Sequence, residues 1–152
     1  MTLSKPVKTA SFVTAKLVAV SLTFLATMAV ASALCYAYTA WLIGPADVVR
    51  FIGLNLLVGL FLVFCLAVTL LFSSLFRSSL AAGGVALGTL VGQGVLSTLP
   101  LFGQFMPGKL LGWGNSLVAG GNDTYWGSLA ITVVLIPLCV YLATMALDKK
   151  EM

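Results

Sequence analysis

The chain has 152 residues, of which 61% are hydrophobic and 8% are charged, and its formal net charge is +4. An ordinary soluble domain carries roughly 25% charged residues, so this composition excludes a water-soluble globular protein. The sequence contains no histidine, the commonest general base and metal ligand, which argues against a catalytic centre. We therefore expect no enzymatic activity, and no metal or cofactor bound by the chain itself.

Four long segments of the chain carry no charged residue and are predicted to cross a membrane as helices. Each lies in an uncharged run longer than the roughly 20 residues that a helix needs to span about 30 Å of hydrocarbon. The predicted spans are residues 17–43, 51–73, 80–98 and 126–147. The sequence thus predicts an all-α membrane protein with one transmembrane domain over residues 1–152. We expect it to be a multi-pass protein of a bacterial or archaeal plasma membrane.

The segment before the first span, residues 1–16, is basic and is predicted to lie in the cytoplasm. It holds Lys5, Lys8 and Lys16, and the apolar run that follows also resembles the core of a cleaved signal peptide. That run continues well beyond the roughly 7–15 apolar residues typical of a signal peptide, which favours a retained helix.

Lysine and arginine are distributed unevenly over the connections between the predicted spans. With a cytoplasmic N-terminus, six of the eight cations fall on the cytoplasmic side and two, Arg50 and Lys109, fall outside. Cytoplasmic loops of membrane proteins are enriched in lysine and arginine, so both termini, including the tail 148–152, are predicted to be cytoplasmic. The positive charge then indicates contact with anionic membrane lipid, not with nucleic acid.

The third predicted span contains glycine at every fourth position, Gly84, Gly88 and Gly92, which places the three on one helix face. Such a face lets another backbone approach closely. We predict helix packing there, with the Gln93 side chain hydrogen-bonded to a neighbouring helix. A second interpretation is that this face borders a translocation path.

Two further features of the spans are interpreted as structural. Pro137 lies in the middle of the last span, where it removes one backbone hydrogen bond and predicts a kink. Cys35, Cys65 and Cys139 fall in three different spans without paired spacing. They are predicted to be small buried apolar side chains, not a disulfide or a metal site.

The connection between the last two spans, residues 99–125, alternates apolar residues with glycine and proline. The segment is too apolar for open water, and glycine and proline break a spanning helix. It is therefore predicted to lie in the extracytoplasmic interface, or to enter the membrane and return. A flexible loop that only joins the two helices is the alternative.

None of the four predicted spans contains an acidic or basic residue. Carriers driven by a proton or sodium gradient usually need an ionisable group inside the membrane to bind the coupling ion. A self-sufficient small carrier is therefore disfavoured. If the protein moves a substrate, the energy must come from a partner.

The N-terminal sequence from Leu3 to Lys8, followed by Phe12-Val13 and Lys16, resembles the membrane subunits of ABC-2 type transporters. That family has a Ser-x-Pro-Val-Ser-Arg-like element before its third helix and a lysine at the helix entrance. The segment from Ser73 to Ala82 is similar to the turn between its fourth and fifth helices. Lys8 and Thr9 stand where the family has serine and arginine.

The family has six helices, and this chain resembles its C-terminal four-helix portion. The resemblance implies a fragment, the product of an internal start, or a split subunit that needs a companion. The resemblance implies a subunit of an ATP-driven exporter, paired with a second permease copy or a companion membrane subunit. It also implies a separate ATP-binding subunit, which alone binds and hydrolyses ATP. The residues implied to dock that subunit are Ser4, Lys5, Pro6, Val7, Lys8, Phe12 and Lys16.

Two alternatives to this interpretation stay open. The basic residues of the N-terminal segment, Lys5, Lys8 and Lys16, already suffice as cytoplasmic anchors by the positive-inside rule, without docking anything. The whole protein is alternatively a small structural or accessory membrane protein that packs through its glycine face.

Overall fold

The computed structural model describes residues 9–42, 44, 47–76, 78–99, 103–121 and 123–151. Within these ranges the chain is helical and has no strand, so the predicted all-α class is confirmed. The elements in chain order are α1 (Thr9–Leu42), α2 (Val48–Leu75), α3 (Ser79–Leu96), the 3-10 turn η1 (Gly103–Phe105), α4 (Lys109–Val118) and α5 (Trp126–Glu151).

Four of these helices, α1, α2, α3 and α5, are long and apolar enough to cross a membrane, and they correspond to the four predicted spans. Two boundaries differ from the prediction by more than three residues. α1 begins at Thr9, ahead of Lys16, and α5 continues to Glu151 through residues predicted to form a tail. Absence of charge marks the part of a helix that suits hydrocarbon, whereas lysine and glutamate are themselves good helix formers.

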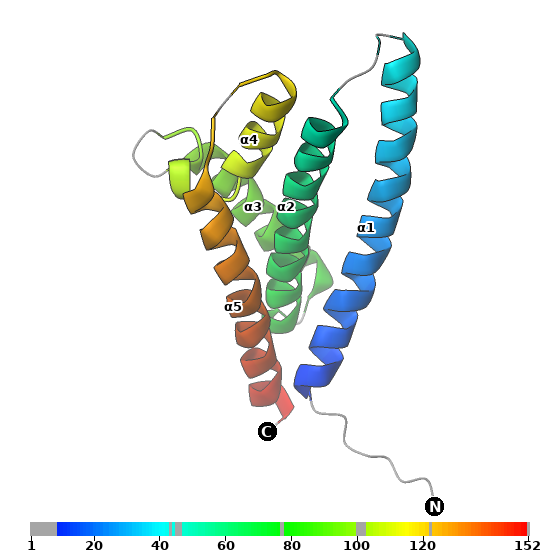
Figure 1. Ribbon diagram of the computed structural model, residues 1–152. Coiled ribbons are helices and arrows are strands. Elements are labelled where there is room, and N and C mark those ends of the chain that lie inside the picture. The colour runs from blue at the N-terminus through cyan, green and yellow to red at the C-terminus, as the bar shows by residue number, and fades with distance from the viewer. Residues whose placement is uncertain are drawn as a thin grey trace, which may run out of the picture.

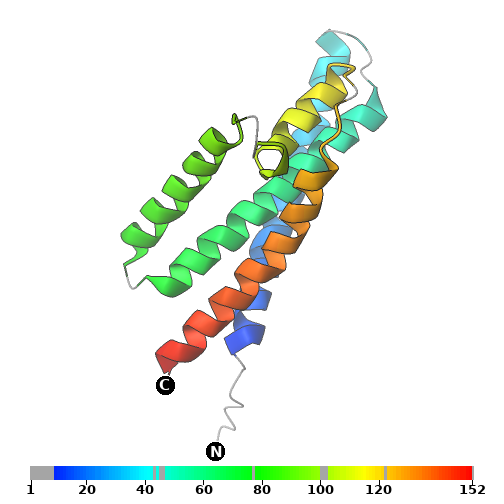
Figure 2. The ribbon, with the colours of Figure 1, turned by 90° about the vertical axis from the view of Figure 1, so that its left-hand side faces the viewer.

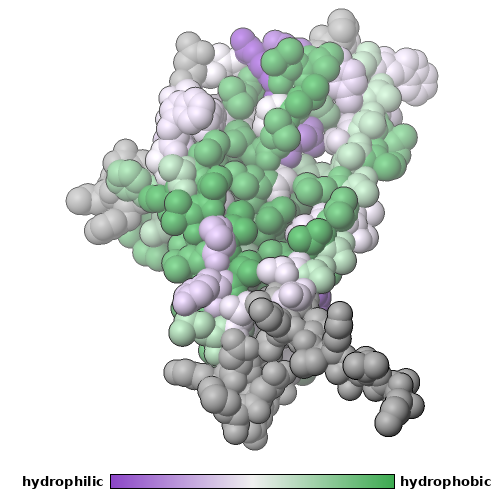
Figure 3. All heavy atoms as spheres, turned by 60° about the horizontal axis from the view of Figure 1, so that its bottom comes forward, coloured by the Kyte–Doolittle hydropathy of each residue, from purple (hydrophilic) through white to green (hydrophobic). Residues whose placement is uncertain are grey.

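The long helices expose large apolar side chains around much of their circumference. Leu34 of α1, Leu80 of α3 and Val134 of α5 each keep about two thirds or more of their surface exposed. Figure 3 shows hydrophobic residues over most of one face of the bundle. Monomeric soluble proteins rarely expose apolar patches of this extent, because exposing apolar surface to water is unfavourable. Exposing the same surface to lipid hydrocarbon has no such cost. The exposure therefore suggests a multi-pass membrane protein.

α2 is the central helix of the bundle and contacts α1, α3, α4 and α5 (Figures 1 and 2). One core, here called the α2–α5 core, contains Phe64, Ala67 and Val68 of α2 and Cys139 of α5. The other, the α2–α4 core, contains Leu57 of α2 with Leu110 and Trp113 of α4. Asp47 caps the start of α2, because its carboxylate accepts a hydrogen bond of 3.1 Å from the backbone N–H of Val49.

α1 is held less firmly than α2. Only 11% of the most apolar stretch of α1 is buried, against 28% for the corresponding stretch of α2. Leu17 packs against the α2–α5 core, and further along the rings of Tyr36 and Phe51 lie 5.3 Å apart. The start of α1 and the end of α5 lie at one end of the bundle, here called the terminal end (Figure 1). The start of α1 and the end of α5 are thus on the same side of the bundle, and which side faces the cytoplasm stays a prediction.

Residues 103–121, between α3 and α5, are folded into η1 and α4, so the alternative of a flexible loop is wrong for this stretch. Leu110 of α4 is fully buried against α2, and the rings of Trp113 and Trp126 lie 5.5 Å apart. The buried hydroxyl of Ser128 donates a 2.6 Å hydrogen bond to the carbonyl oxygen of Met106, which ties the segment to α5. Its location relative to the membrane surface stays a prediction.

The tightest point of this segment gives a test of the fold. A Cβ atom on Gly103 would lie 2.5 Å from the carbonyl oxygen of Ser97, so alanine there must displace backbone. We expect Gly103→Ala to lower the free energy of unfolding by about 1–3 kcal/mol, a usual cost of overpacking. The measurement is thermal unfolding of the detergent-solubilised protein.

Gly112→Ala is the matched control, because a Cβ atom at Gly112 of α4 meets nothing within 4 Å. Alanine inside a helix is favoured over glycine by about 0.5–1 kcal/mol, so this variant should unfold at the wild-type temperature or slightly above it. Equal stability of the two variants would contradict the close approach at Gly103.

Candidate functional site

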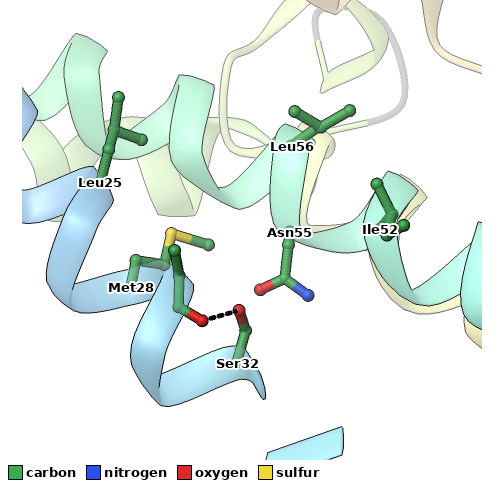
Figure 4. A pocket seen from close by; sticks show the side chains of 7 residues that line it. Leu25, Met28, Ser32, Ile52, Asn55 and Leu56 are labelled. Carbon is green, nitrogen blue, oxygen red and sulfur yellow. Dashed lines mark hydrogen bonds between the residues drawn. The ribbon is translucent and has the colours of Figure 1, made fainter.

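A groove of about 200 Å³ lies between α1 and α2, toward the end of the bundle opposite the terminal end. An adjoining hollow of about 240 Å³ extends it toward Tyr36 and Phe51. The groove residues are Leu25, Met28, Ala29 and Ser32 of α1 and Ile52, Asn55 and Leu56 of α2 (Figure 4). We call this site the Asn55 groove.

The groove arises from the sizes of the residues that face each other. At Gly59 of α2 the two helices approach closely, because a Cβ atom there would lie 3.2 Å from the Cδ2 atom of Leu25. Beyond this contact α1 presents the small side chains of Ala29 and Ser32 toward α2. Small side chains leave space where large ones would fill the seam, so the groove begins next to the contact at Gly59.

The polar groups of the groove are a carboxamide and a hydroxyl in an otherwise apolar wall. The Nδ2 atom of Asn55 donates a 2.8 Å hydrogen bond to the carbonyl oxygen of Phe51, and Ser32 donates one of 3.0 Å to that of Ala29. Figure 4 shows the carboxamide directed across the groove toward α1. Asn55 keeps its Oδ1 acceptor and a second N–H for a ligand, since the structure shows no bond from it to α1 within the described residues.

This arrangement suits an apolar molecule with one hydrogen-bonding group. Most of the groove wall is aliphatic and would contact a hydrocarbon chain or ring. The carboxamide of Asn55 supplies both a donor and an acceptor, and its hydrogen bonds are stronger in a low dielectric than in water. The side chains of the groove wall are uncharged, which suits the binding of such an uncharged, largely apolar molecule.

The residues predicted to dock an ATP-binding subunit are only partly placed. Ser4, Lys5, Pro6, Val7 and Lys8 lie outside the described residues. Phe12 and Lys16 both belong to α1, close to its start, and the Lys16 side chain is exposed. The structure therefore places the last two members of this set on the same continuous helix that lines the Asn55 groove.

The glycine face of α3 is open within this chain. A Cβ atom on Gly84, Gly88 or Gly92 would meet nothing within 4 Å, so no described helix packs on these residues. α3 packs instead through Ala82 and Ala86, which are buried. Residues two positions apart on a helix lie about 200° around it, so packing through these alanines turns the glycines away from α2.

Gln93, Pro137 and the cysteines complete the sequence predictions. Gln93 is half-buried, and its side chain has no hydrogen-bond partner among the described residues, so a bond to another helix stays a prediction about a second polypeptide. α5 passes through Pro137 without ending, and a kink there stays a prediction. Cys139 is buried and Cys65 half-buried, as expected, whereas Cys35 is exposed on α1.

No protein-family model, curated protein or solved structure matches this chain. The resemblance to ABC-2 membrane subunits therefore rests on the sequence motifs alone. Asn55 was not among the predicted site residues. The sequence signal for Asn55 was a carboxamide within an uncharged span. That signal does not predict a groove, because the groove also depends on the small residues of α1 that face Asn55.

The volume of the Asn55 groove gives a test by filling it. Ala29→Leu adds an aliphatic side chain where the groove has space, and cavity filling commonly stabilises a protein by about 0.5–2 kcal/mol. We expect a higher unfolding temperature in detergent. Ala31→Leu, an identical change at an exposed position of α1, should leave it unchanged. A loss of stability only in Ala29→Leu would show that the space is too small.

Proposed function

We propose that this chain is a membrane subunit, complete or partial, of an ATP-driven exporter of the ABC-2 kind, and that a separate ATP-binding subunit hydrolyses the nucleotide. The observation that carries the proposal is the continuity of α1 from Thr9 to Leu42. This one helix joins the candidate docking residues Phe12 and Lys16 to the Asn55 groove. Because a helix is stiff along its axis, a displacement of the start of α1 would also displace the part of α1 that lines the groove.

The weak attachment of α1 supports the same proposal. Rearrangement of an exporter requires an element whose contacts can change at low cost, and such elements have few buried apolar contacts. α1 is only 11% buried in its most apolar window and meets α2 closely at Gly59. Movement of α1 about this contact would open or close the Asn55 groove, with the end of α1 near Lys16 as the lever arm.

The source of energy follows from the sequence of the spans. The four spans contain no acidic or basic residue, so no side chain in them can bind and release a coupling proton. An ATP-binding subunit on the cytoplasmic side supplies the energy instead, with both termini of this chain on that side. The open glycine face of α3 supports contact with a second membrane subunit, either another copy or a companion.

The decisive test of this proposal is whether an ATP-binding subunit co-purifies with the chain. The full chain, purified from its native membrane in mild detergent, should retain an ATP-binding subunit with measurable ATPase activity. Pro6→Ala and Lys8→Glu should each lower the recovered ATPase several-fold, because both change the segment proposed to dock it. Lys109→Glu, in α4, should not. Recovery of the chain without any ATPase would count against the exporter.

A second candidate function, a structural or accessory membrane protein, is favoured by the open glycine face. Gly88→Leu should leave the unfolding temperature of the chain unchanged, since nothing lies within 4 Å of that position, yet abolish its assembly with other membrane subunits. Gly112→Leu, at a second open glycine, serves as the control and should preserve assembly. Lost assembly without any transport defect would favour this second function over the exporter.

A further inference from the structure

A second groove lies between α1 and α2, nearer the terminal end, and shares Lys16 with the residues proposed to dock the ATP-binding subunit. Its volume is about 230 Å³, and its wall is formed by Lys16 and Val20 of α1 with Leu66, Thr69, Leu70 and Ser73 of α2. We propose that this groove, here called the Lys16 groove, binds one anionic phospholipid, with the phosphate at Lys16 and Ser73 and an acyl chain along the leucines.

The order of side chains along the groove matches the order of groups in a phospholipid. Lys16 and Ser73 are each the wall residue closest to the terminal end on their own helix, because α1 begins there and α2 ends there. One helical turn deeper, α1 presents Val20, and α2 presents Leu70 and then Leu66. A charged entrance followed by an aliphatic wall accommodates a charged head group followed by an acyl chain.

The charge at the entrance has no counter-ion in the described part of the chain. The single ion pair found there joins Arg50 to Asp47 at 3.3 Å, at the opposite end of the bundle. Among the carboxylates whose side chains the structure describes, Asp47 precedes α2 and Asp123 precedes α5, so both lie far along the helices from Lys16. An unpaired ammonium group at the edge of an apolar groove favours an anionic ligand.

The hydroxyl groups of the groove are suited to a phosphate in different degrees. Thr69 already donates a 2.8 Å hydrogen bond to the carbonyl oxygen of Cys65, so its proton is used. Ser73 is exposed and makes no side-chain hydrogen bond within the described residues, so its proton is free for a phosphate oxygen. Lys16 and Ser73, one from each helix, therefore supply the two donors.

The aliphatic wall distinguishes a lipid from a free phosphate. Three of the six wall residues, Val20, Leu66 and Leu70, are aliphatic, and a small inorganic anion would gain nothing from them. An acyl chain fills this part of the groove and gains dispersion contacts with each. The lipid would contact both α1 and α2. The close contact at Gly59 would separate it from the Asn55 groove.

The test is lipid retention by the purified full chain in detergent, measured by native mass spectrometry with phosphatidylglycerol and phosphatidylcholine of equal chain length. We expect one phosphatidylglycerol per chain, preferred at least tenfold over phosphatidylcholine. Lys16→Gln should abolish the preference, and Lys109→Gln, which removes a lysine from α4, should retain it. Val20→Trp should displace the lipid by filling the groove, with Leu70→Trp as a second filling variant.

Several results would overturn the proposal. An equal loss of preference in Lys16→Gln and Lys109→Gln would show diffuse attraction to total charge. Retained lipid in both folded tryptophan variants would place the lipid elsewhere, and displacement by millimolar inorganic phosphate would show that the acyl chain is not held. Occupation of the groove by a second copy of the chain, in place of lipid, would also overturn the proposal. This test measures retained lipid and not recovered ATPase activity, so its failure leaves the exporter proposal untouched.

Discussion

The packing of α2 against the other helices is the interaction on which the rest of the structure depends. Ala67, at the centre of the α2–α5 core, is fully buried, and Gly114 of α4 lies so close to Leu54 that a Cβ atom would come within 2.6 Å of the leucine Cδ1. Lipid tails are as apolar as leucine, so close packing and not the hydrophobic effect holds such helices together. Small residues at these contacts supply that packing.

This constraint explains which features of the fold the sequence predicts. Absence of charge identifies the four long helices, because a charged side chain in hydrocarbon is costly whatever its neighbours are. The same reasoning overlooks α4, a short helix of the segment 99–125. Its buried residues Leu110 and Trp113, with Leu117, follow helical spacing, but Gly112 and Gly114 break the local propensity, and packing on α2 compensates for that.

The glycines show why a site is harder to predict than a span. Gly84, Gly88 and Gly92 have the spacing of a packing face, and so do Ala82, Ala86 and Leu90 on the other side of the same helix. Spacing defines both faces equally well, and only the structure shows that the alanines are the buried ones. Inside the helices, the glycines that admit close neighbours are Gly59 and Gly114. They belong to no repeated pattern, so the sequence gives no sign of them.

The hydroxyl groups of α1 explain how a weakly packed helix can remain stable in lipid. Thr23, Thr27 and Thr39 each donate a hydrogen bond to a carbonyl oxygen three or four residues earlier in the same helix. Their polar groups are therefore satisfied without a partner helix, as hydrocarbon requires. These three hydroxyl groups therefore keep their hydrogen bonds when the contacts of α1 with α2 change. A helix that shifts against a neighbour in lipid needs few buried contacts and internally bonded polar side chains, and the threonines and the low burial of α1 supply both.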